Sequence, residues 1–68
     1  MNEAEAELAE VERRMSLVRE NLRTLTEQAA ALSGAADEAK AADRIAEQDA
    51  LLERLSKQRD ALQKRLKA

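Results

Sequence analysis

The sequence predicts an all-α fold, namely a two-helix antiparallel coiled-coil hairpin that we expect to dimerise into a four-helix bundle. Three observations predict it. Helix-forming residues dominate a chain of 68 residues that has no aromatic residue and no proline. Apolar residues recur with heptad spacing in both halves. The two heptad registers are out of phase, and the break falls beside Gly34, the only glycine. We therefore expect one domain over residues 1–68, with helices at 3–33 and 37–67 and a turn at 34–36.

The first predicted helix has an uninterrupted heptad pattern between Leu8 and Leu32. Successive apolar residues are alternately three and four positions apart, which places them on one stripe of a helix. Such a stripe is the seam along which two coiled-coil helices pack. The a and d positions of this half of the seam are Leu8, Val11, Met15, Val18, Leu22, Leu25, Ala29 and Leu32.

The predicted turn lies where the first register ends. In one continuous helix, the apolar stripe would have to move to a different face of the helix between Leu32 and Ala41. A hairpin requires no such change of face. Gly34 suits the left-handed C′ position that ends many helices. Asp37 suits the N-cap of the second helix, and Glu38 adds negative charge at its positive end.

The second predicted helix continues the seam with a heptad pattern of its own, in which two positions are polar. We interpret Gln48 and Arg59 as residues that fix the register, with the Arg59 head group near Glu10 or Glu12. The alternative is that both mark a face where a partner binds. The a and d positions of this half are Ala41, Ile45, Gln48, Leu52, Leu55, Arg59, Leu62 and Leu66.

The two halves of the seam agree with one antiparallel alignment. Pairing positions whose numbers sum to 70 brings every a residue of one helix opposite a d residue of the other. Ala29 then meets Ala41 near the turn, and Glu7 lies near Arg65 at the other end. This agreement supports the hairpin, because the two registers were assigned separately.

Some apolar residues lie beside the seam, at positions c and g of the heptad. They fall on one side of the hairpin, which we call the Leu17/Leu51 flank. We interpret this flank as a second interface, because a chain this short needs more burial than one seam provides. The alternative is that Leu17 and Leu51 are scattered surface residues, which need no explanation. The predicted interface residues are Leu17, Ala31, Leu51 and Ala61.

The composition argues against most kinds of site chemistry. The chain contains no histidine and no cysteine, so the preferred ligands of zinc and the usual catalytic bases and nucleophiles are missing. Two helices offer no pocket that would raise the pKa of a carboxyl group. We therefore expect no catalytic, cofactor or metal site and no small-molecule substrate. No apolar run approaches the ~20 residues that span a bilayer, so we expect a cytoplasmic protein without a membrane segment.

The function that these features favour is binding. We expect a non-enzymatic protein–protein interaction module, such as a small adaptor, chaperone or assembly factor, with a second copy or another helical protein as partner. One alternative is a nucleic-acid-binding regulator, because the expected architecture resembles that of Rop-like plasmid copy-number regulators. We do not expect nucleic-acid binding, since the net charge is −2 and acidic residues interleave with the cations of the second helix. The other alternative is a structural coiled-coil scaffold.

Overall fold

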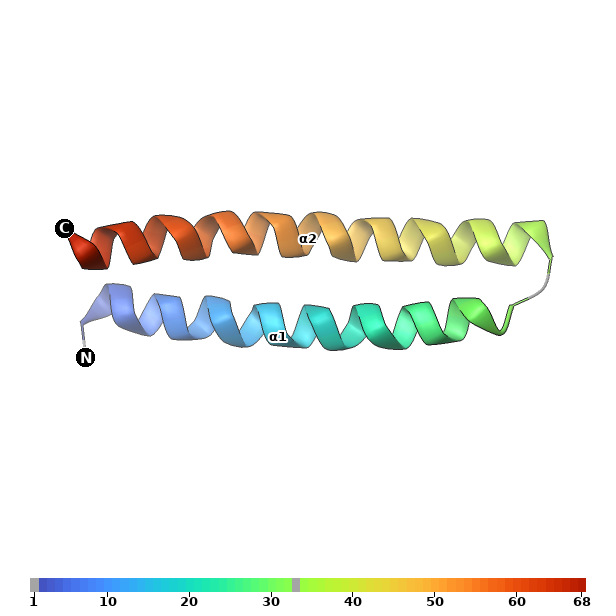
Figure 1. Ribbon diagram of the computed structural model, residues 1–68, viewed down its shortest axis with the longest axis horizontal. Coiled ribbons are helices and arrows are strands. Elements are labelled where there is room, and N and C mark those ends of the chain that lie inside the picture. Colours follow the sequence, from blue (N-terminus) through green and yellow to red (C-terminus); the bar gives the residue numbers. More distant parts are fainter. Residues whose placement is uncertain (1, 33) are drawn as a thin grey trace.

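The computed structural model describes residues 2–32 and 34–68, and it contains two long helices packed side by side as a hairpin (Figure 1). Helix α1 spans Glu3–Ala30 and helix α2 spans Ala35–Lys67. The helices are antiparallel, so both termini lie at one end and the turn lies at the other. The long dimension is 51 Å, about half the ~100 Å of a straight helix of this length. The predicted all-α hairpin is confirmed.

The start of α1 is capped by a residue that the sequence analysis did not single out. Asn2 has extended backbone angles, and its side-chain Oδ1 accepts a hydrogen bond of 2.8 Å from the backbone N–H of Glu5. This contact satisfies one of the N–H groups that have no partner within the helix. Glu3 and Glu5 add negative charge to the first turn, where it interacts favourably with the helix dipole.

The end of α1 differs from the prediction. The helix ends at Ala30, with Ala31 as the C-cap, whereas the predicted end at Ser33 lies outside the described residues. The last backbone bonds tighten to a three-residue spacing, because the N–H of Ala31 donates to the carbonyl of Gln28 and that of Leu32 to the carbonyl of Ala29. Leu32 therefore lies beyond the helix and is 38% exposed, so it is not part of the buried seam.

The start of α2 also corrects the prediction, because residues 35 and 36 belong to the helix and not to the turn. Gly34 is the N-cap of α2 and not the C′ residue of α1, and the predicted N-cap Asp37 is already within the first turn. The φ angle of Gly34 is 107°, which glycine adopts without the penalty of a Cβ atom. A glycine has no side chain to cap a helix, so the favourable charge of Asp37 and Glu38 is what stabilises this end.

The core lies in the half of the hairpin that contains the termini. Met15 is the most deeply buried side chain, at 1% exposure. The other buried residues come from both helices, and all five lie on the predicted seam. They are Val11, Met15 and Val18 of α1 and Leu55 and Leu62 of α2.

The half of the hairpin near the turn is packed less deeply. Its seam residues are only half-buried, even where they are large, as at Leu25 and Ile45. The physical reason is size, because Ala29 and Ala41 provide little side chain to fill the space between the helices. The hairpin therefore has a closed terminal half and an open turn half. The half-buried seam residues of the open half are Leu22, Leu25, Ala29, Ala41, Ile45 and Gln48.

The described helices show no segment that is both long and apolar enough to pass through a bilayer.

Candidate functional site

The Leu17/Leu51 flank is the candidate functional site. Leu17 is 52% exposed on α1, which is the largest exposed fraction among the large apolar side chains of the described residues. Leu51 of α2 is half-buried and packs against the core. Ala31 and Ala61 are exposed on the same flank. The flank thus combines an exposed leucine with a second leucine that is anchored in the core.

Three grooves between the helices lie along this flank. The terminal groove has Val11 and Leu62 at its base, the middle groove has Leu25 and Gln48, and the turn groove has Leu25, Ala29 and Ala41. Leu17 lies between the terminal and middle grooves, because it is three residues after Arg14 of the first and four before Asn21 of the second. The predicted interface residue Ala61 lines the terminal groove, and Ala31 lines the turn groove. The residues that line the grooves are Glu3, Ala6, Glu7, Glu10, Val11, Arg14, Gln58, Ala61, Leu62 and Arg65 (terminal); Asn21, Thr24, Leu25, Arg44, Glu47 and Gln48 (middle); and Leu25, Gln28, Ala29, Ala31, Leu32, Asp37, Lys40, Ala41 and Arg44 (turn).

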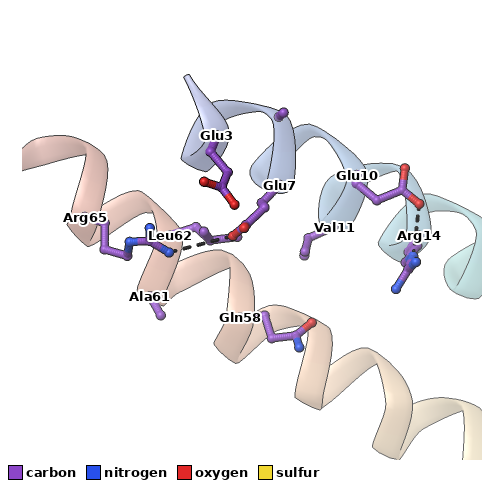
Figure 2. A pocket seen from close by; sticks show the side chains of 10 residues that line it. Glu3, Glu7, Glu10, Val11, Arg14, Gln58, Ala61, Leu62 and Arg65 are labelled. Atoms are coloured by element: carbon purple, nitrogen blue, oxygen red, sulfur yellow. Dashed lines mark hydrogen bonds and ion pairs between the residues drawn. The ribbon is translucent and has the colours of Figure 1, made fainter. Parts of the chain in front are cut away.

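The rim of the terminal groove is charged on both sides (Figure 2). Glu3, Glu7 and Glu10 come from α1, and Arg65 comes from α2. An Arg65 Nη1 atom lies 3.7 Å from an Oε2 atom of Glu7, and both side chains are largely in solvent. The predicted proximity of Glu7 and Arg65 is therefore confirmed. An exposed pair of this kind contributes about 0.2–1 kcal/mol, which selects the register more than it stabilises the fold.

The carboxyl group of Glu10 is held in its ionised form by two neighbouring arginines. Arg13 donates to both Glu10 oxygens, at 2.7 and 3.1 Å, and Arg14 Nε donates to Oε1 at 3.1 Å. The hydrogen bonds from Arg13 and then Arg14 lower the pKa of Glu10 from 4.5 to about 2, and the same contact raises the pKa of Arg13. A general acid needs the opposite shift. Glu10 therefore supplies a permanent charge to the groove and not a proton.

The polar seam residues lie as the register requires, but Arg59 has a different partner from the one predicted. Gln48 and Arg59 are both half-buried. The Nε and Nη2 atoms of Arg59 each lie 3.1 Å from Oδ1 of Asp60, its neighbour on α2. Among the described residues, Arg59 forms no hydrogen bond or ion pair with Glu10 or Glu12, so the predicted partner of its head group is not found. Its stem remains in the seam while its charge turns outward.

The described residues, 2–32 and 34–68, do not bring three or more His, Cys, Asp or Glu side chains together as metal ligands. On the flank, Glu7 and Glu10 instead stand beside arginines, which compensate their charge.

Comparison with protein families, curated proteins and solved structures finds no significant match to this chain. The functional argument therefore rests on the hairpin and on its Leu17/Leu51 flank.

Proposed function

We propose that this chain is a non-enzymatic protein–protein interaction module that binds α-helices along the Leu17/Leu51 flank. The observation that carries the proposal is the position of the three grooves, which follow one another along the same flank as the exposed Leu17. Helical partners commonly lay an apolar face into such a groove and contact it at positions three and four residues apart. An adaptor, chaperone or assembly factor would use the flank in this way.

The shape and charge of the grooves favour a helix over a small molecule. Ligand pockets bury most of their ligand in a concave site, whereas these grooves are open and extend along the two antiparallel helices. Their bases are apolar, as at Val11 and Leu62, and their rims carry both signs of charge, as at Glu7 and Arg65. Apolar bases with charged rims match the composition of a coiled-coil helix, in which charges flank the apolar seam.

The same charges argue against a nucleic acid as the main partner. Phosphate binding requires clustered cations, but Glu3, Glu7 and Glu10 stand on the terminal groove, and Asp37 and Glu47 stand on the other two. Tight RNA or DNA binding that weakens steeply as salt is raised and is lost when the cations of the flank are substituted would contradict the proposed role of the flank.

The proposal is tested by affinity capture from the native organism with three forms of the chain. The wild type is compared with Leu17→Glu and with a control, Ala9→Glu, which adds the same charge at an exposed position outside the flank. We expect a helical protein that the wild type and the control retain and Leu17→Glu loses. Addition of the purified partner to isotopically labelled chain should then shift NMR signals along the flank. A partner that Leu17→Glu binds as well as the wild type would refute the proposal.

A further inference from the structure

We infer that the Leu17/Leu51 flank binds a second copy of this chain, in a twofold-symmetric four-helix bundle whose two turns lie at the same end. The twofold axis runs parallel to the helices, so that α1 of each copy packs on α2 of the other. This inference rests on the proposed function, because it names the partner of the same flank.

The elongated hairpin exposes more surface than a compact monomer of its mass. The accessible surface is 5108 Å², whereas a compact monomer of 7.6 kDa exposes about 4,300 Å². The excess of about 800 Å² is close to what each partner buries in a stable interface of standard size. A second hairpin laid on the flank would bury part of this excess surface with residues of the same chain.

The charges at the terminal end favour this arrangement of the two copies. Residues 1–12 contain five glutamates and no cation, and residues 57–68 contain five cations and one aspartate. When α1 of one copy packs on α2 of the other with the turns together, each acidic segment lies beside a basic segment of the partner. Opposite charges then alternate around the four helices, as they already do within one hairpin between Glu7 and Arg65.

The other twofold arrangement places the turn of one copy against the termini of its partner. The acidic start of α1 then faces residues 21–32 of the partner, which carry one arginine and one glutamate and so offer no net positive charge. The basic end of α2 faces residues 35–46, whose charges nearly cancel. Neither charged segment is compensated in that arrangement, which therefore loses the electrostatic match.

The apolar residues of the flank fit the same arrangement. Leu17 of one copy lies at nearly the same level along the bundle axis as the partner's Leu51. Residues at the same level have numbers that sum to 70, and these two sum to 68. The two turn grooves, lined by Leu25, Ala29 and Ala41, come together at one end. The open turn half of each hairpin is thereby covered by the open turn half of the other, which excludes water from the seam residues of both.

The first measurement is the mass in solution by sedimentation equilibrium. We expect about twice the 7.6 kDa of the chain for the wild type and 7.6 kDa for Leu17→Glu with Leu51→Glu. Since Leu51 packs on the core, Leu17→Glu alone is the second variant, and circular dichroism checks that the helices persist. The control is Ala9→Glu with Ala46→Glu, which adds the same two charges at exposed positions outside the flank and should keep the doubled mass. A helical Leu17→Glu variant that retains the doubled mass would overturn the inference.

The second measurement distinguishes the two arrangements. The chain has no cysteine, so Ala36→Cys near the turn and Ala68→Cys near the terminus can be labelled at single sites. With donor and acceptor both at residue 36 on different copies, we expect efficient energy transfer, because diagonal helices of a bundle lie about 14 Å apart. A donor at residue 36 and an acceptor at residue 68 should give little transfer, since the hairpin is 51 Å long. The reverse result would overturn the proposed arrangement.

The two experiments also separate this inference from the proposed function. A chain that sediments at 7.6 kDa but still binds another helical protein through Leu17 would overturn the inference and leave the proposed function standing. A chain that neither doubles its mass nor loses a captured partner on Leu17→Glu substitution would refute both.

Discussion

Replacement of Leu55 by alanine should destabilise the hairpin more than the same replacement at Leu25. Leu55 is 5% exposed in the closed terminal half, where a buried Leu→Ala change costs about 3–5 kcal/mol, because it removes apolar contacts and leaves a cavity. Leu25 lies half-buried beside the middle and turn grooves. Three carbon atoms at about 0.8 kcal/mol each, with most but not all of their surface out of water, give a cost of about 1.5–2 kcal/mol.

The difference of at least about 1 kcal/mol corresponds to a gap of at least about 4–8 °C in melting temperature for a domain of this size. The cost of Leu55→Ala also decides whether that variant is folded, because a core in a chain of this length rarely provides more than about 3–5 kcal/mol. Both substitutions replace leucine by alanine within a helix, so their effects on helix propensity cancel.

The assay is thermal unfolding followed by circular dichroism, at the lowest protein concentration that gives a signal. Low concentration matters because a second copy on the Leu17/Leu51 flank would bury Leu25 further. We expect Leu55→Ala to be largely unfolded at 25 °C and Leu25→Ala to unfold cooperatively about 6–16 °C below the wild type. Equal shifts in melting temperature would refute the assignment of the core to the terminal half.

Three further predictions concern the turn, the first cap and the charged rim. Gly34→Ala should cost about 1–3 kcal/mol because of the φ of 107°, although a Cβ there meets no atom within 4 Å; an unchanged melting temperature would contradict the reasoning. Asn2→Ala should cost about 1 kcal/mol through the lost bond to the Glu5 N–H, while Asn2→Asp should keep most of it in the same unfolding assay. The Glu10 carboxyl should titrate by NMR with a pKa of about 2 in the wild type and closer to 4.5 in Arg13→Ala. Because folding lowers this pKa, the stabilising contribution of the carboxylate is present above about pH 4.5 and is lost as the pH falls toward 2. A pKa unchanged by Arg13→Ala would show that the arginine does not hold the charge.

The sequence was sufficient to predict the hairpin and the line along which its helices pack. Heptad spacing determines which face of each helix turns inward, and every seam position within the two helices is buried or half-buried. The pairing rule also predicted the ends of the molecule, because Glu7 and Arg65 lie 3.7 Å apart. Periodicity is a property of the whole helix, so it survives small errors at the ends.

The sequence was insufficient for details that depend on local competition. The depth of burial differs between Met15 and Leu25, although both occupy seam positions, because depth depends on the size of the residues opposite. The start of α2 at Ala35 depends on the backbone of Gly34, which can end one helix or begin the next. Arg59 had several carboxylates within reach, and Asp60 lies nearest along the chain.

The open turn half and the exposed flank have a common physical consequence for the stability of the chain. Among its described residues, the single hairpin buries only five side chains, and small domains bury the smallest fraction of their surface. If a second copy covers the flank, its binding energy adds to the folding energy by mass action. The melting temperature should then rise with protein concentration in the wild type and stay constant in Leu17→Glu. It should also rise less in Leu25→Ala than in the wild type, since Leu25 lines the turn groove that the partner closes. A wild-type melting temperature that is independent of concentration would mean that the hairpin folds without the flank, and that the flank serves a partner other than the chain itself.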